Sequence, residues 1–309
     1  MKAVRIHSYG ASDLLIYEEA PMPVTGENDV LIRVQAASVN PVDAAIRAGY
    51  MSSYIPLTFP ATLGCDVAGT VEALGSAVTN LKIGDAVYTR TDLFRLGGYA
   101  EYVIVTAAEV ALKPASIDFI QAASLPHAAL TAWRSLIDTA GLSAGQTVLI
   151  HAAAGGVGSL AVQLAKARGA YVIGTASTPN QGFIKELGVD EAVDYTAGPF
   201  EDKVHGVDIV FDTVGGDTQT RSFQILKPGG FLVSVVQPPS AEAAAAHGVR
   251  VALVGAYPPV APVLNEISAL IAAGKLKPVV SAVLHLSEAQ RGQDLIASRR
   301  TRGKIVLQV

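Results

Sequence analysis

A turn of small residues in the middle of the chain has the composition of an anion-binding site. Ala153, Gly155 and Gly158 have the spacing of the GxGxxG pattern, with alanine in place of the first glycine. The apolar run Thr147–His151 precedes this turn, and apolar residues at helical spacing follow it from Ser159 to Arg168. Strand, tight turn and helix in this order predict a helix N-terminus whose free N–H groups and dipole hold a pyrophosphate.

The glycines of this turn have separate roles in the predicted site. Gly155 lets the backbone approach a pyrophosphate without an intervening Cβ, and Gly158 lets the helix pack closely on the strand. Small-residue turns also join strands to helices in proteins that bind no nucleotide, and it is the full strand–turn–helix context that favours a dinucleotide. The residues predicted to bind it here are Gly155, Gly156, Val157 and Gly158.

The segment Thr175–Gln181 bears on which dinucleotide binds. A carboxylate about 20 residues beyond the glycines would hydrogen-bond the adenosine ribose and repel a 2′-phosphate. That position falls near Ser177, and the segment contains neither Asp nor Glu. Hydroxyl and amide groups there favour NADPH over NADH, with a polar loop that touches no ligand as the alternative. Since no Lys or Arg follows within the segment, use of NADH stays open.

The composition limits the classes of protein to consider. The chain has 309 residues, of which 50% are hydrophobic and 16% charged, so it is long enough for one large or two ordinary domains. Its net charge of -4 argues against nucleic acid as the main partner. The longest apolar region, Val251–Leu264, contains three prolines and is too short to span a bilayer. With the single cysteine, Cys65, and no signal-peptide pattern, we expect a cytoplasmic protein with no membrane partner.

The elements that must position these groups fall into two parts. Up to about residue 120, short β-prone runs alternate with Gly, Pro, Asn and Asp at spacings typical of an antiparallel barrel. From residue 147 strands alternate with helices, which implies a parallel sheet with helices on both faces. The predicted strands are Ala3–His7, Val30–Ala36, Ala68–Leu74, Ala86–Thr89, Ala100–Val105, Thr147–His151, Tyr171–Thr175, Ala192–Asp194, Val207–Asp212, Gly230–Val236 and Val251–Gly255. The predicted helices are Pro41–Ala48, one or more within Ile120–Leu142, Ser159–Arg168, Val263–Ala273 and Glu288–Ser298.

The chain therefore reads as an α/β protein with a nucleotide-binding domain inserted into a β-rich one. We expect residues 1–122 and 263–309 to form the β-barrel domain, because the final β-prone run, Lys304–Val309, suits a return to it. Residues 123–262 are expected to form the doubly wound parallel-sheet domain.

Several strings of residues, taken together and in order, resemble one family. They are Ala37–Asp43, Ile46–Gly49, Leu63–Val71, Lys82–Tyr88, Gly97–Tyr102, Ala153–Gly158, Gln163–Ala165 and Gly303–Leu307. Over nearly its whole length the chain resembles the zinc-independent quinone oxidoreductases of the medium-chain dehydrogenase/reductase superfamily. The resemblance implies a GroES-like barrel domain, a Rossmann domain between its two segments, an active site in the cleft between them, and a homodimer. It also implies NAD(P)H-dependent reduction of quinones or of the activated C=C bonds of enones and enals.

Three positions bear on whether a metal takes part. Where zinc-dependent members carry their ligands, this chain has Asn40, then Cys65 with Asp66, and, on a looser alignment, His127. Asn is a poor zinc ligand, and the two strong ligands that remain make an inadequate catalytic site. We predict no metal, which favours hydride delivery to an electron-poor carbon over ionisation of an alcohol. The alternatives are a zinc-dependent NAD(P) alcohol dehydrogenase and a non-catalytic NADPH-binding redox sensor.

The predicted reaction assigns roles to polar residues of the first domain. Hydride from the reduced nicotinamide would add to a quinone or to the β-carbon of an α,β-unsaturated carbonyl, and the charge on the carbonyl oxygen needs a hydrogen-bond donor. Asn40 is the predicted donor, to the substrate or to the nicotinamide carboxamide, with capping of the following helix as its other role. Tyr50 or Tyr54 is predicted to protonate the enolate, with water as the alternative acid. Relatives often have a tyrosine where this chain has Ala45, which implies a wider or differently lined pocket.

The remaining predicted coenzyme contacts come from the second domain. Tyr195 stands where relatives place a group near the adenosine half, and Thr131 either touches the nicotinamide or is a helix residue packed between the two domains. The ends of the fifth and sixth parallel strands border the nicotinamide, where open sheets bind ligands. The residues predicted there are Val235, Val236, Ala256 and Tyr257. We expect the edge strand Val251–Gly255 to mediate the homodimer.

Overall fold

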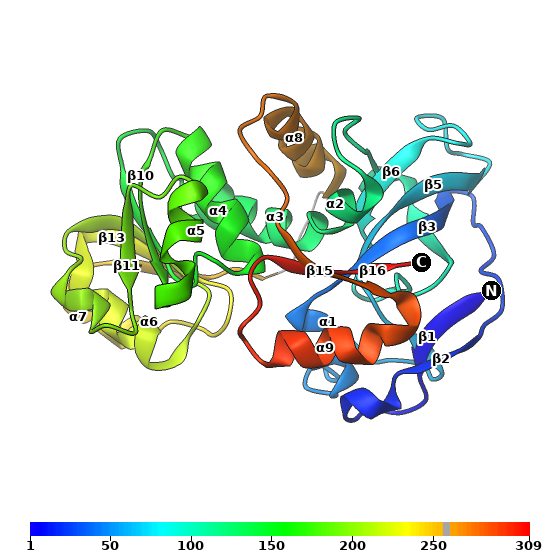
Figure 1. Ribbon diagram of the computed structural model, residues 1–309, viewed down its shortest axis with the longest axis horizontal. Helices are drawn as coiled ribbons and strands as arrows, with labels where there is room; N and C mark the ends of the chain where they lie inside the picture. The colour runs from blue at the N-terminus through cyan, green and yellow to red at the C-terminus, as the bar shows by residue number, and fades with distance from the viewer. Residues whose placement is uncertain (256–259) are drawn as a thin grey trace. The chain divides into compact units, whose positions relative to one another are not determined.

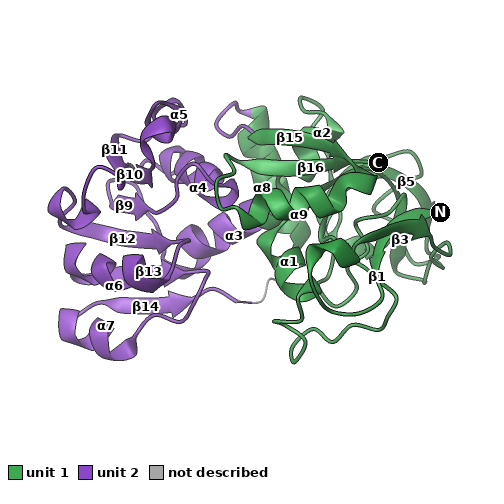
Figure 2. Cartoon of the chain, turned by 60° about the horizontal axis from the view of Figure 1, so that its bottom comes forward, with its two compact units in different colours: residues 1–127, 259–272, 278–309 green, residues 128–258, 273–277 purple. Residues whose placement is uncertain are grey.

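The computed structural model describes residues 1–255 and 260–309, and the chain divides into two compact units, coloured separately in Figure 2. Unit 1 comprises residues 1–127, 259–272 and 278–309, and unit 2 comprises 128–258 and 273–277. The expected domains, 1–122 with 263–309 and 123–262, place 273–277 in the first domain. In the structure that segment packs with unit 2, because Lys277 is held by the side chain of Gln163. The Gln163 amide accepts from the Lys277 N–H at 2.8 Å and donates to the Lys277 carbonyl at 3.0 Å.

The described part of unit 1 contains two sheets (Figure 1). A seven-stranded sheet has the order β15-β16-β3-β5-β6-β8, with β7 paired to β3, and a three-stranded sheet has the order β2-β1-β4. All of these pairs are antiparallel except β15 with β16. The strands are β1 Lys2–Ile6, β2 Ile16–Glu19, β3 Asp29–Val39, β4 Ala61–Thr62, β5 Asp66–Leu74, β6 Ala86–Arg90, β7 Tyr102–Thr106, β8 Ala111–Leu112, β15 Val280–His285 and β16 Lys304–Gln308.

Strand β3 organises unit 1, because it pairs with β5, β7 and β16. Its register sets Ser38 opposite Asp66 of β5 and Val39 opposite Ile305 of β16. Apolar side chains such as Val30 and Ile32 are fully buried in the core beneath it. The end of β3 therefore meets the starts of β5 and β16, at the residue that follows β3.

Unit 2 is built on a parallel six-stranded sheet with the order β11-β10-β9-β12-β13-β14. Numbered along the chain, this order is 3-2-1-4-5-6, the arrangement in which dinucleotides bind at the carboxyl ends of the central strands. Helices α4 Gly156–Ala167, α5 Gln181–Glu186, α6 Gly216–Ser222 and α7 Ala241–His247 pack on it. The strands are β9 Thr147–Ile150, β10 Tyr171–Ala176, β11 Glu191–Asp194, β12 Val207–Asp212, β13 Leu226–Ser234 and β14 Arg250–Leu253.

The helical region predicted within residues 120–142 is divided into three segments. Helix α2, Phe119–Ala123, begins after Asp118, whose carboxylate accepts the Gln121 N–H at 2.7 Å. Pro126 then starts a new helix, α3 Pro126–Trp133, because proline suits a first helical turn but not a helix interior. A π-helical segment, η3 Arg134–Thr139, completes the region. The other helices are α1 Pro41–Arg47, α8 Val260–Ala272 and α9 Ala289–Ala297.

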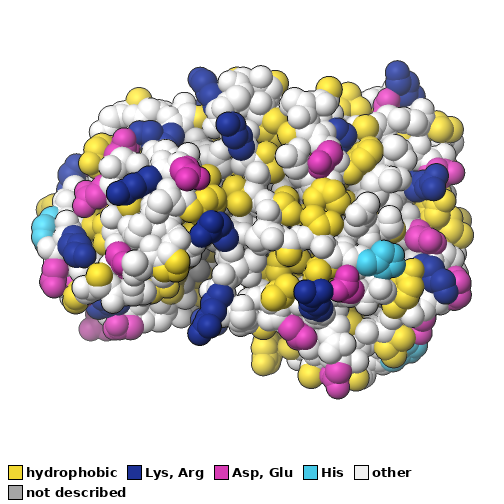
Figure 3. Space-filling model, viewed as in Figure 1, with side chains coloured by type: hydrophobic (Ala, Val, Ile, Leu, Met, Phe, Trp, Pro, Cys, Tyr) yellow, Lys and Arg dark blue, Asp and Glu magenta, His cyan; other side chains and the backbone are white. Residues whose placement is uncertain are grey.

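The distribution of charge on the surface and the length of the helices both concern the predicted partners. On the face shown in Figure 3, Lys and Arg side chains are interspersed with Asp and Glu. Within residues 1–255 and 260–309, every helix is too short or too polar to cross a bilayer.

Candidate active site

The turn between β9 and α4 has the close packing that its glycines predict. Gly155 is the N-cap residue of α4, with extended backbone angles (φ −76°, ψ 177°). A Cβ on Gly158 would lie 2.2 Å from the Ala152 carbonyl oxygen, so this approach of helix to turn requires glycine. The left-handed residue of the turn is Ala152 (φ 48°), and for this reason alanine is accommodated at 153. The first N–H groups of α4, which have no carbonyl partner within the helix, form a surface that fits a pyrophosphate.

The second and third strands end side by side, at the predicted adenosine subsite. Ala176 of β10 is in register with Asp194 of β11, so Ser177 and Tyr195, which follow them, are neighbours. The Tyr195 side chain is 55% exposed, and the Tyr195 N–H donates to the Ala176 carbonyl at 3.4 Å. These two predicted residues are thus at one edge of the parallel sheet. The structure brings them together.

An acidic residue that the sequence reasoning did not consider lies beside them. The Asp194 carboxylate accepts hydrogen bonds from the Thr178 hydroxyl at 2.6 Å and from the Thr196 hydroxyl and N–H at 2.6 and 2.9 Å. Hydrogen bonds from Thr178 and then Thr196 lower the pKa of Asp194, so it is ionised. It belongs to the third strand, not the second, and therefore lies outside the segment 175–181 in which a carboxylate would be expected.

A buried histidine lies at the carboxyl end of the first parallel strand. His151 is fully buried, with Nδ1 3.2 Å from the Thr175 hydroxyl and Nε2 2.9 Å from the Ser222 hydroxyl. The Ser222 hydroxyl already donates to the Thr218 carbonyl at 2.7 Å, so it accepts from Nε2–H and Nδ1 accepts from Thr175. Burial is the main cause that lowers the His151 pKa to about 4, and the ring is therefore neutral at pH 7.

The next strand ends in a buried carboxylate. Asp212 accepts the Val214 and Gly215 N–H groups at 2.9 and 2.8 Å, the Gln219 amide at 2.9 Å and the Ser234 hydroxyl at 2.8 Å. These four neutral donors come from the loop, helix and strand that follow β12. The sequence reasoning assigned His151 and Asp212 no role. Their place at the ends of predicted parallel strands was the signal that could have found them.

The remaining coenzyme residues predicted in unit 2 lie in the loop after β13, in helix α3 and outside the described residues. Strand β13 ends at Ser234, earlier than expected, so Val235 and Val236 lie in the following loop, where the Val235 N–H donates to the Asp212 carbonyl at 3.2 Å. Thr131 is buried in α3, and its carbonyl accepts the Ser135 hydroxyl at 2.7 Å. Ala256 and Tyr257 lie outside the described residues.

In unit 1 the predicted donor, Asn40, is buried and hydrogen-bonded through both its backbone and its side chain. It is 1% exposed and precedes α1, where its N–H donates to Asp43 Oδ2 at 2.9 Å. Its side-chain Nδ2 donates to Asp66 Oδ2 at 2.9 Å and lies 3.5 Å from Cys65 Sγ, and its Oδ1 accepts a hydrogen bond from Lys304 Nζ. Asn40 is therefore the N-cap residue of α1, which is its alternative predicted role. The hydrogen bonds of its side-chain amide are all made to other residues of the protein.

Asp66 and Lys304 form a buried ion pair around this amide. Asp66 is fully buried and also accepts the Ser38 hydroxyl and the His127 N–H, each at 2.8 Å. The Lys304 side chain is 6% exposed, with Nζ 3.6 Å from Asp66 Oδ2 and 3.3 Å from the Val39 carbonyl oxygen. The structure thus brings Asn40, Cys65, Asp66 and His127 together, with a lysine that the sequence reasoning assigned only to a family motif.

A second buried carboxylate adjoins this cluster. Asp43 Oδ2 accepts the Tyr99 hydroxyl at 3.0 Å, while Asp43 Oδ1 is buried. Burial is the largest cause that raises the Asp43 pKa to about 6, with a smaller contribution from Asp66. The thiol of Cys65 has its pKa raised well above the usual range, first by burial and then by the two carboxylates.

The two predicted proton donors are exposed. Tyr50 and Tyr54 lie in the turns after α1 and are 85% and 78% exposed. Among the described residues no hydrogen bond joins either phenol to Asn40. Both hydroxyls are open to solvent, and their predicted roles rest on the sequence alone.

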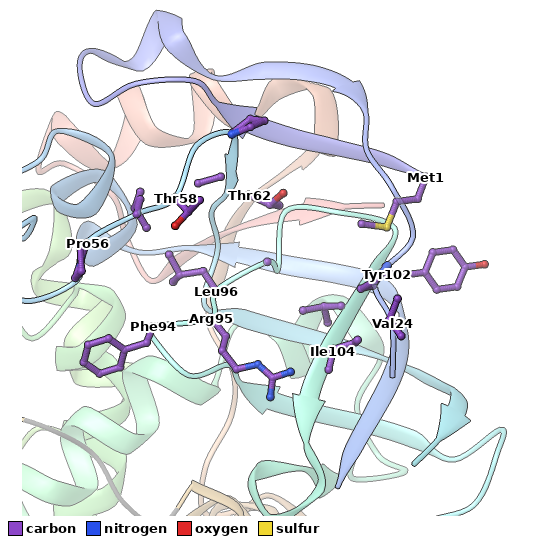
Figure 4. Close-up of a pocket in the computed structure, with 16 residues that line it drawn as sticks. Met1, Val24, Pro56, Thr58, Thr62, Phe94, Arg95, Leu96, Tyr102 and Ile104 are labelled. Atoms are coloured by element: carbon purple, nitrogen blue, oxygen red, sulfur yellow. The ribbon is translucent and has the colours of Figure 1, made fainter. Parts of the chain in front are cut away.

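A surface cavity of about 530 Å³ lies on unit 1 (Figure 4). Phe94 and Pro56 lie toward one end and Met1 and Val24 toward the other. Its one charged lining residue, Arg95, is engaged by Asp29 through two hydrogen bonds of 2.9 and 3.1 Å. None of the predicted site residues that the structure describes lines this cavity.

Comparison with known proteins identifies the family. A model described as alcohol dehydrogenase GroES-like domain matches residues 26–115, and one described as zinc-binding dehydrogenase matches 187–307. The chain is similar to the mitochondrial NAD(P)H oxidoreductase RTN4IP1 of Danio rerio, with 33% identity over 100% of this chain and 91% of that protein. The chloroplastic NADPH-dependent alkenal/one oxidoreductase of Arabidopsis thaliana is 41% identical over 91% of this chain and 72% of its own length. The quinone oxidoreductase structure from Coxiella burnetii superposes with a TM-score of 0.94 at 37% identity, covering 100% and 99% of the two chains.

The chain belongs to the medium-chain dehydrogenase/reductase superfamily. The predicted fold class, a GroES-like domain with a Rossmann-type parallel sheet, is confirmed. The relatives of this medium-chain dehydrogenase/reductase include quinone oxidoreductases and an enone reductase, as the sequence motifs indicate.

One family model is described as zinc-binding, so we asked whether the residues present fit zinc. Within 1–255 and 260–309, no group of three His, Cys, Asp or Glu side chains is arranged to hold a metal ion. The cluster at Asn40 offers amide and carboxylate oxygens with a single thiol, Cys65, and it already contains the Lys304 ammonium. In this medium-chain dehydrogenase/reductase the donor set does not fit zinc, which prefers thiolate and imidazole.

Proposed function

We propose that this protein is an NADPH-dependent oxidoreductase that reduces quinones and the activated C=C bonds of enones and enals without a metal. The observation that carries the proposal is the Gly158–Ala152 approach at the first strand of a 3-2-1-4-5-6 parallel sheet, the place where a pyrophosphate would bind. Support for the substrate class comes from relatives that are named quinone oxidoreductase and alkenal/one oxidoreductase.

Unit 2 supplies the coenzyme contacts. Gly155–Gly158 would hold the pyrophosphate, and Ser177 and Tyr195 would hold the adenosine half, with hydroxyls in place of a second-strand carboxylate. Thr131, Val235, Val236, Ala256 and Tyr257 stay the predicted contacts of the nicotinamide. When bound, the reduced nicotinamide supplies the hydride.

Beneath the proposed coenzyme-binding residues of unit 2, His151 and Asp212 act as positioning residues. The neutral imidazole ties the end of β9 to Thr175 of β10 and to Ser222 of α6. Asp212 fixes the loop after β12 through the Val214 and Gly215 N–H groups. They keep the carboxyl ends of the strands aligned while placing no net positive charge under the coenzyme.

Unit 1 supplies the substrate-directed groups. Asn40 stays the predicted amide donor, and Asp66 and Lys304 fix its orientation. Its Nδ2 already donates to Asp66 Oδ2 and lies 3.4 Å from the Ser38 carbonyl oxygen, so a substrate oxygen would have to replace one of these acceptors. Tyr50 or Tyr54 stays the predicted donor of the proton to the substrate enolate, with water as the alternative acid. Both phenols are exposed, so each can exchange its proton with solvent.

Two further features belong to the same proposal. We infer a homodimer formed through the sheet edge at β14, since an exposed strand edge offers unpaired backbone groups. A cytoplasmic location is inferred from the single, buried cysteine, and the mitochondrial relative makes that organelle the alternative.

The test is NADPH consumption by the purified protein, measured against 1,4-quinones, short enals and long-chain enones, with NADH as the second coenzyme. We expect turnover with members of this panel and none when an alcohol and NADP⁺ are supplied instead. Alcohol-driven reduction of NADP⁺ that a chelator abolishes would establish the zinc-dependent alternative. NADPH binding without turnover on any acceptor would establish the redox sensor.

A matched pair of variants tests whether Ser177 lies at the adenosine end of the coenzyme site, with the preference for NADPH over NADH as the measured quantity. Ser177→Glu restores a carboxylate at the end of β10, and we expect it to weaken NADPH use relative to NADH by at least about tenfold. Thr220→Glu adds the same charge on an exposed face of α6 and should leave the preference unchanged. An unchanged preference in Ser177→Glu would contradict the assignment of the adenosine subsite.

A further inference from the structure

The carboxylate of Asp194 lies at the adenosine end of the coenzyme site proposed for unit 2. Asp194 is the last residue of β11 and is in register with Ala176, the last residue of β10. The residues that follow these two, Tyr195 and Ser177, are the predicted contacts of the adenosine half of the coenzyme. A carboxylate of the third strand therefore stands beside the position where a second-strand carboxylate was expected and is missing.

Two threonine hydroxyls hold this carboxylate at the ends of the two strands. Thr178 donates to Asp194 Oδ2 and Thr196 donates to Asp194 Oδ1, each at 2.6 Å, and the Thr196 N–H donates to Oδ1 at 2.9 Å. Thr178 directly follows Ser177, so the carboxylate is tied to the loop that carries the predicted adenosine contact. Because each hydroxyl hydrogen is directed at Asp194, neither threonine can at the same time donate to a phosphate oxygen.

The negative charge of Asp194 has no cation beside it. Neither residues 175–181 nor residues 191–198 include Lys or Arg, and in the described part of the chain the Asp194 carboxylate is hydrogen-bonded by threonines and forms no ion pair. The side chains of Thr178, Tyr195 and Thr196 around it are exposed. A phosphate, which carries about −1.5 to −2 charges at pH 7, would be repelled by a fixed carboxylate at this place.

Ser177 provides the attractive contact on the same loop. The Asn180 amide donates to Ser177 Oγ at 3.2 Å, and the Asn180 N–H donates to the Ser177 carbonyl at 2.8 Å. Since its oxygen already accepts from Asn180, the Ser177 hydroxyl can direct its hydrogen outward, either to a 2′-phosphate oxygen of NADPH or to the ribose 2′-hydroxyl of NADH. Ser177 thus suits both coenzymes, and the charged group that distinguishes them is Asp194.

Building on the proposed coenzyme site, we propose that Asp194 is a specificity-determining residue that opposes the 2′-phosphate and so narrows the preference for NADPH over NADH. Its oxygens are occupied by Thr178 and Thr196, so it acts through its charge and not as a ligand of the ribose. NADPH still binds, through the pyrophosphate turn and Ser177, but with a smaller advantage than the missing second-strand carboxylate alone would give it.

The experiment measures the dissociation constants of NADPH and NADH by coenzyme fluorescence, for the wild type and Asp194→Asn at low ionic strength. The two coenzymes differ only in the 2′-phosphate, so the ratio of their constants isolates its contribution. We expect Asp194→Asn to raise the preference for NADPH at least about fivefold. Glu191→Gln removes the same charge at the other end of β11 and should keep the wild-type ratio.

A second measurement uses the wild type alone and covers the case in which Asp194→Asn does not fold. Raising the salt concentration from about 0.01 M to 1 M shortens the Debye length from about 30 Å to about 3 Å and screens the repulsion. The preference for NADPH should therefore rise with salt, whereas a site that holds the 2′-phosphate with Lys or Arg would lose preference.

The proposal is overturned if the wild-type preference falls or stays constant with salt, if folded Asp194→Asn keeps the wild-type ratio, or if Glu191→Gln changes the ratio as much as Asp194→Asn. Neither measurement involves an acceptor, so binding without turnover would count against the proposed reaction and leave the role of Asp194 standing. Failure of the wild type to bind either coenzyme would overturn both.

Discussion

Each unit buries a carboxylate near its candidate site, and the two are stabilised in different ways. Asp66 of unit 1 faces the ammonium of Lys304 and accepts hydrogen bonds from Asn40, Ser38 and the His127 N–H. Asp212 of unit 2 has no ammonium or guanidinium within ion-pair distance among the described residues. It is satisfied by four neutral donors.

The difference fits the roles proposed for the two units. A coenzyme pyrophosphate is held by backbone N–H groups at a helix N-terminus, so the interior below it needs rigidity more than charge. In unit 1 an ammonium, which can only donate, instead faces the amide oxygen of Asn40, whereas a hydroxyl could donate or accept and would allow either orientation of the amide. The two clusters should therefore respond differently to loss of charge, to pH and to added volume.

The largest effect is expected from neutralising the two carboxylates. Asp66→Asn leaves the Lys304 ammonium buried without its counter-charge, and we expect a loss of about 3–5 kcal/mol in the free energy of unfolding. Asp212→Asn sets one amide N–H₂ against hydrogen-bond donors and should lose about 1–3 kcal/mol. Urea unfolding of both variants at pH 7 gives the comparison, and equal losses would show that the ammonium is not what distinguishes the clusters.

The next largest difference between the two clusters is expected in how their contributions to stability depend on pH. The folded pKa of His151 is about 4, below the ordinary 6.5, so between these values the unfolded chain binds a proton that the folded chain does not. Its contribution to stability is complete above pH 6.5 and falls by about 1.4 kcal/mol per pH unit toward pH 4. In His151→Gln we expect the urea midpoint to fall less between pH 7 and pH 5 than in the wild type.

Unit 1 contains a buried group, Asp43, whose effect on the pH dependence of stability is opposite in direction to that of His151. The Asp43 pKa is raised to about 6 from 3.8, so the folded chain binds the proton more tightly and this group adds stability as pH falls between those values. His127, whose burial lowers its pKa to about 4, acts in the opposite direction within the same unit. Asp43→Asn should therefore steepen the acid loss of stability that His151→Gln reduces. A change in the same direction in both variants would contradict the assignment.

A smaller effect is expected from adding volume to the turn in unit 2. Gly158→Ala places a Cβ 2.2 Å from the Ala152 oxygen, and we expect a loss of about 1–3 kcal/mol with weakened NADPH binding. Gly182 lies in α5 with open space where its Cβ would be, so Gly182→Ala should be neutral or slightly stabilising and leave coenzyme binding unchanged. Thermal unfolding and NADPH titration of the pair measure both quantities. Normal NADPH affinity in Gly158→Ala would mean that the turn does not hold the coenzyme.

The smallest effect is expected at the exposed phenols of unit 1. Because Tyr50 and Tyr54 are exposed and water has equal access, Tyr50→Phe and Tyr54→Phe should each lower kcat less than about threefold. Stability should be unchanged within about 0.5 kcal/mol, since neither hydroxyl is buried. A fall in kcat of tenfold or more in one variant would identify that tyrosine as the proton donor.

The sequence predicted what depends on local chemistry. The small-residue turn and the alternation of strands and helices follow from short-range patterns, and the structure contains both. Ser177 was found by counting from the glycines and Tyr195 by the family resemblance, and the two are neighbours at the ends of β10 and β11. The ends of elements were less accurate: α8 begins at Val260, not Val263, and β13 ends at Ser234. The pairing of Lys304 with Asp66 depends on strand register over long separations, which no local pattern encodes. Asp194 was missed for a related reason, because its neighbour Thr178 lies on the loop after another strand.

The position of Lys304 in β16 also has a consequence for the order in which the protein folds during synthesis. The strands of unit 2 between residues 147 and 253 leave the ribosome before β16, so that sheet can pair its strands while unit 1 is still incomplete. Asp66 and Asn40 emerge early, yet the ammonium that holds them emerges only with β16. Until then the nascent barrel carries a carboxylate without its ammonium partner, so this region cannot become dry before the last strand is added.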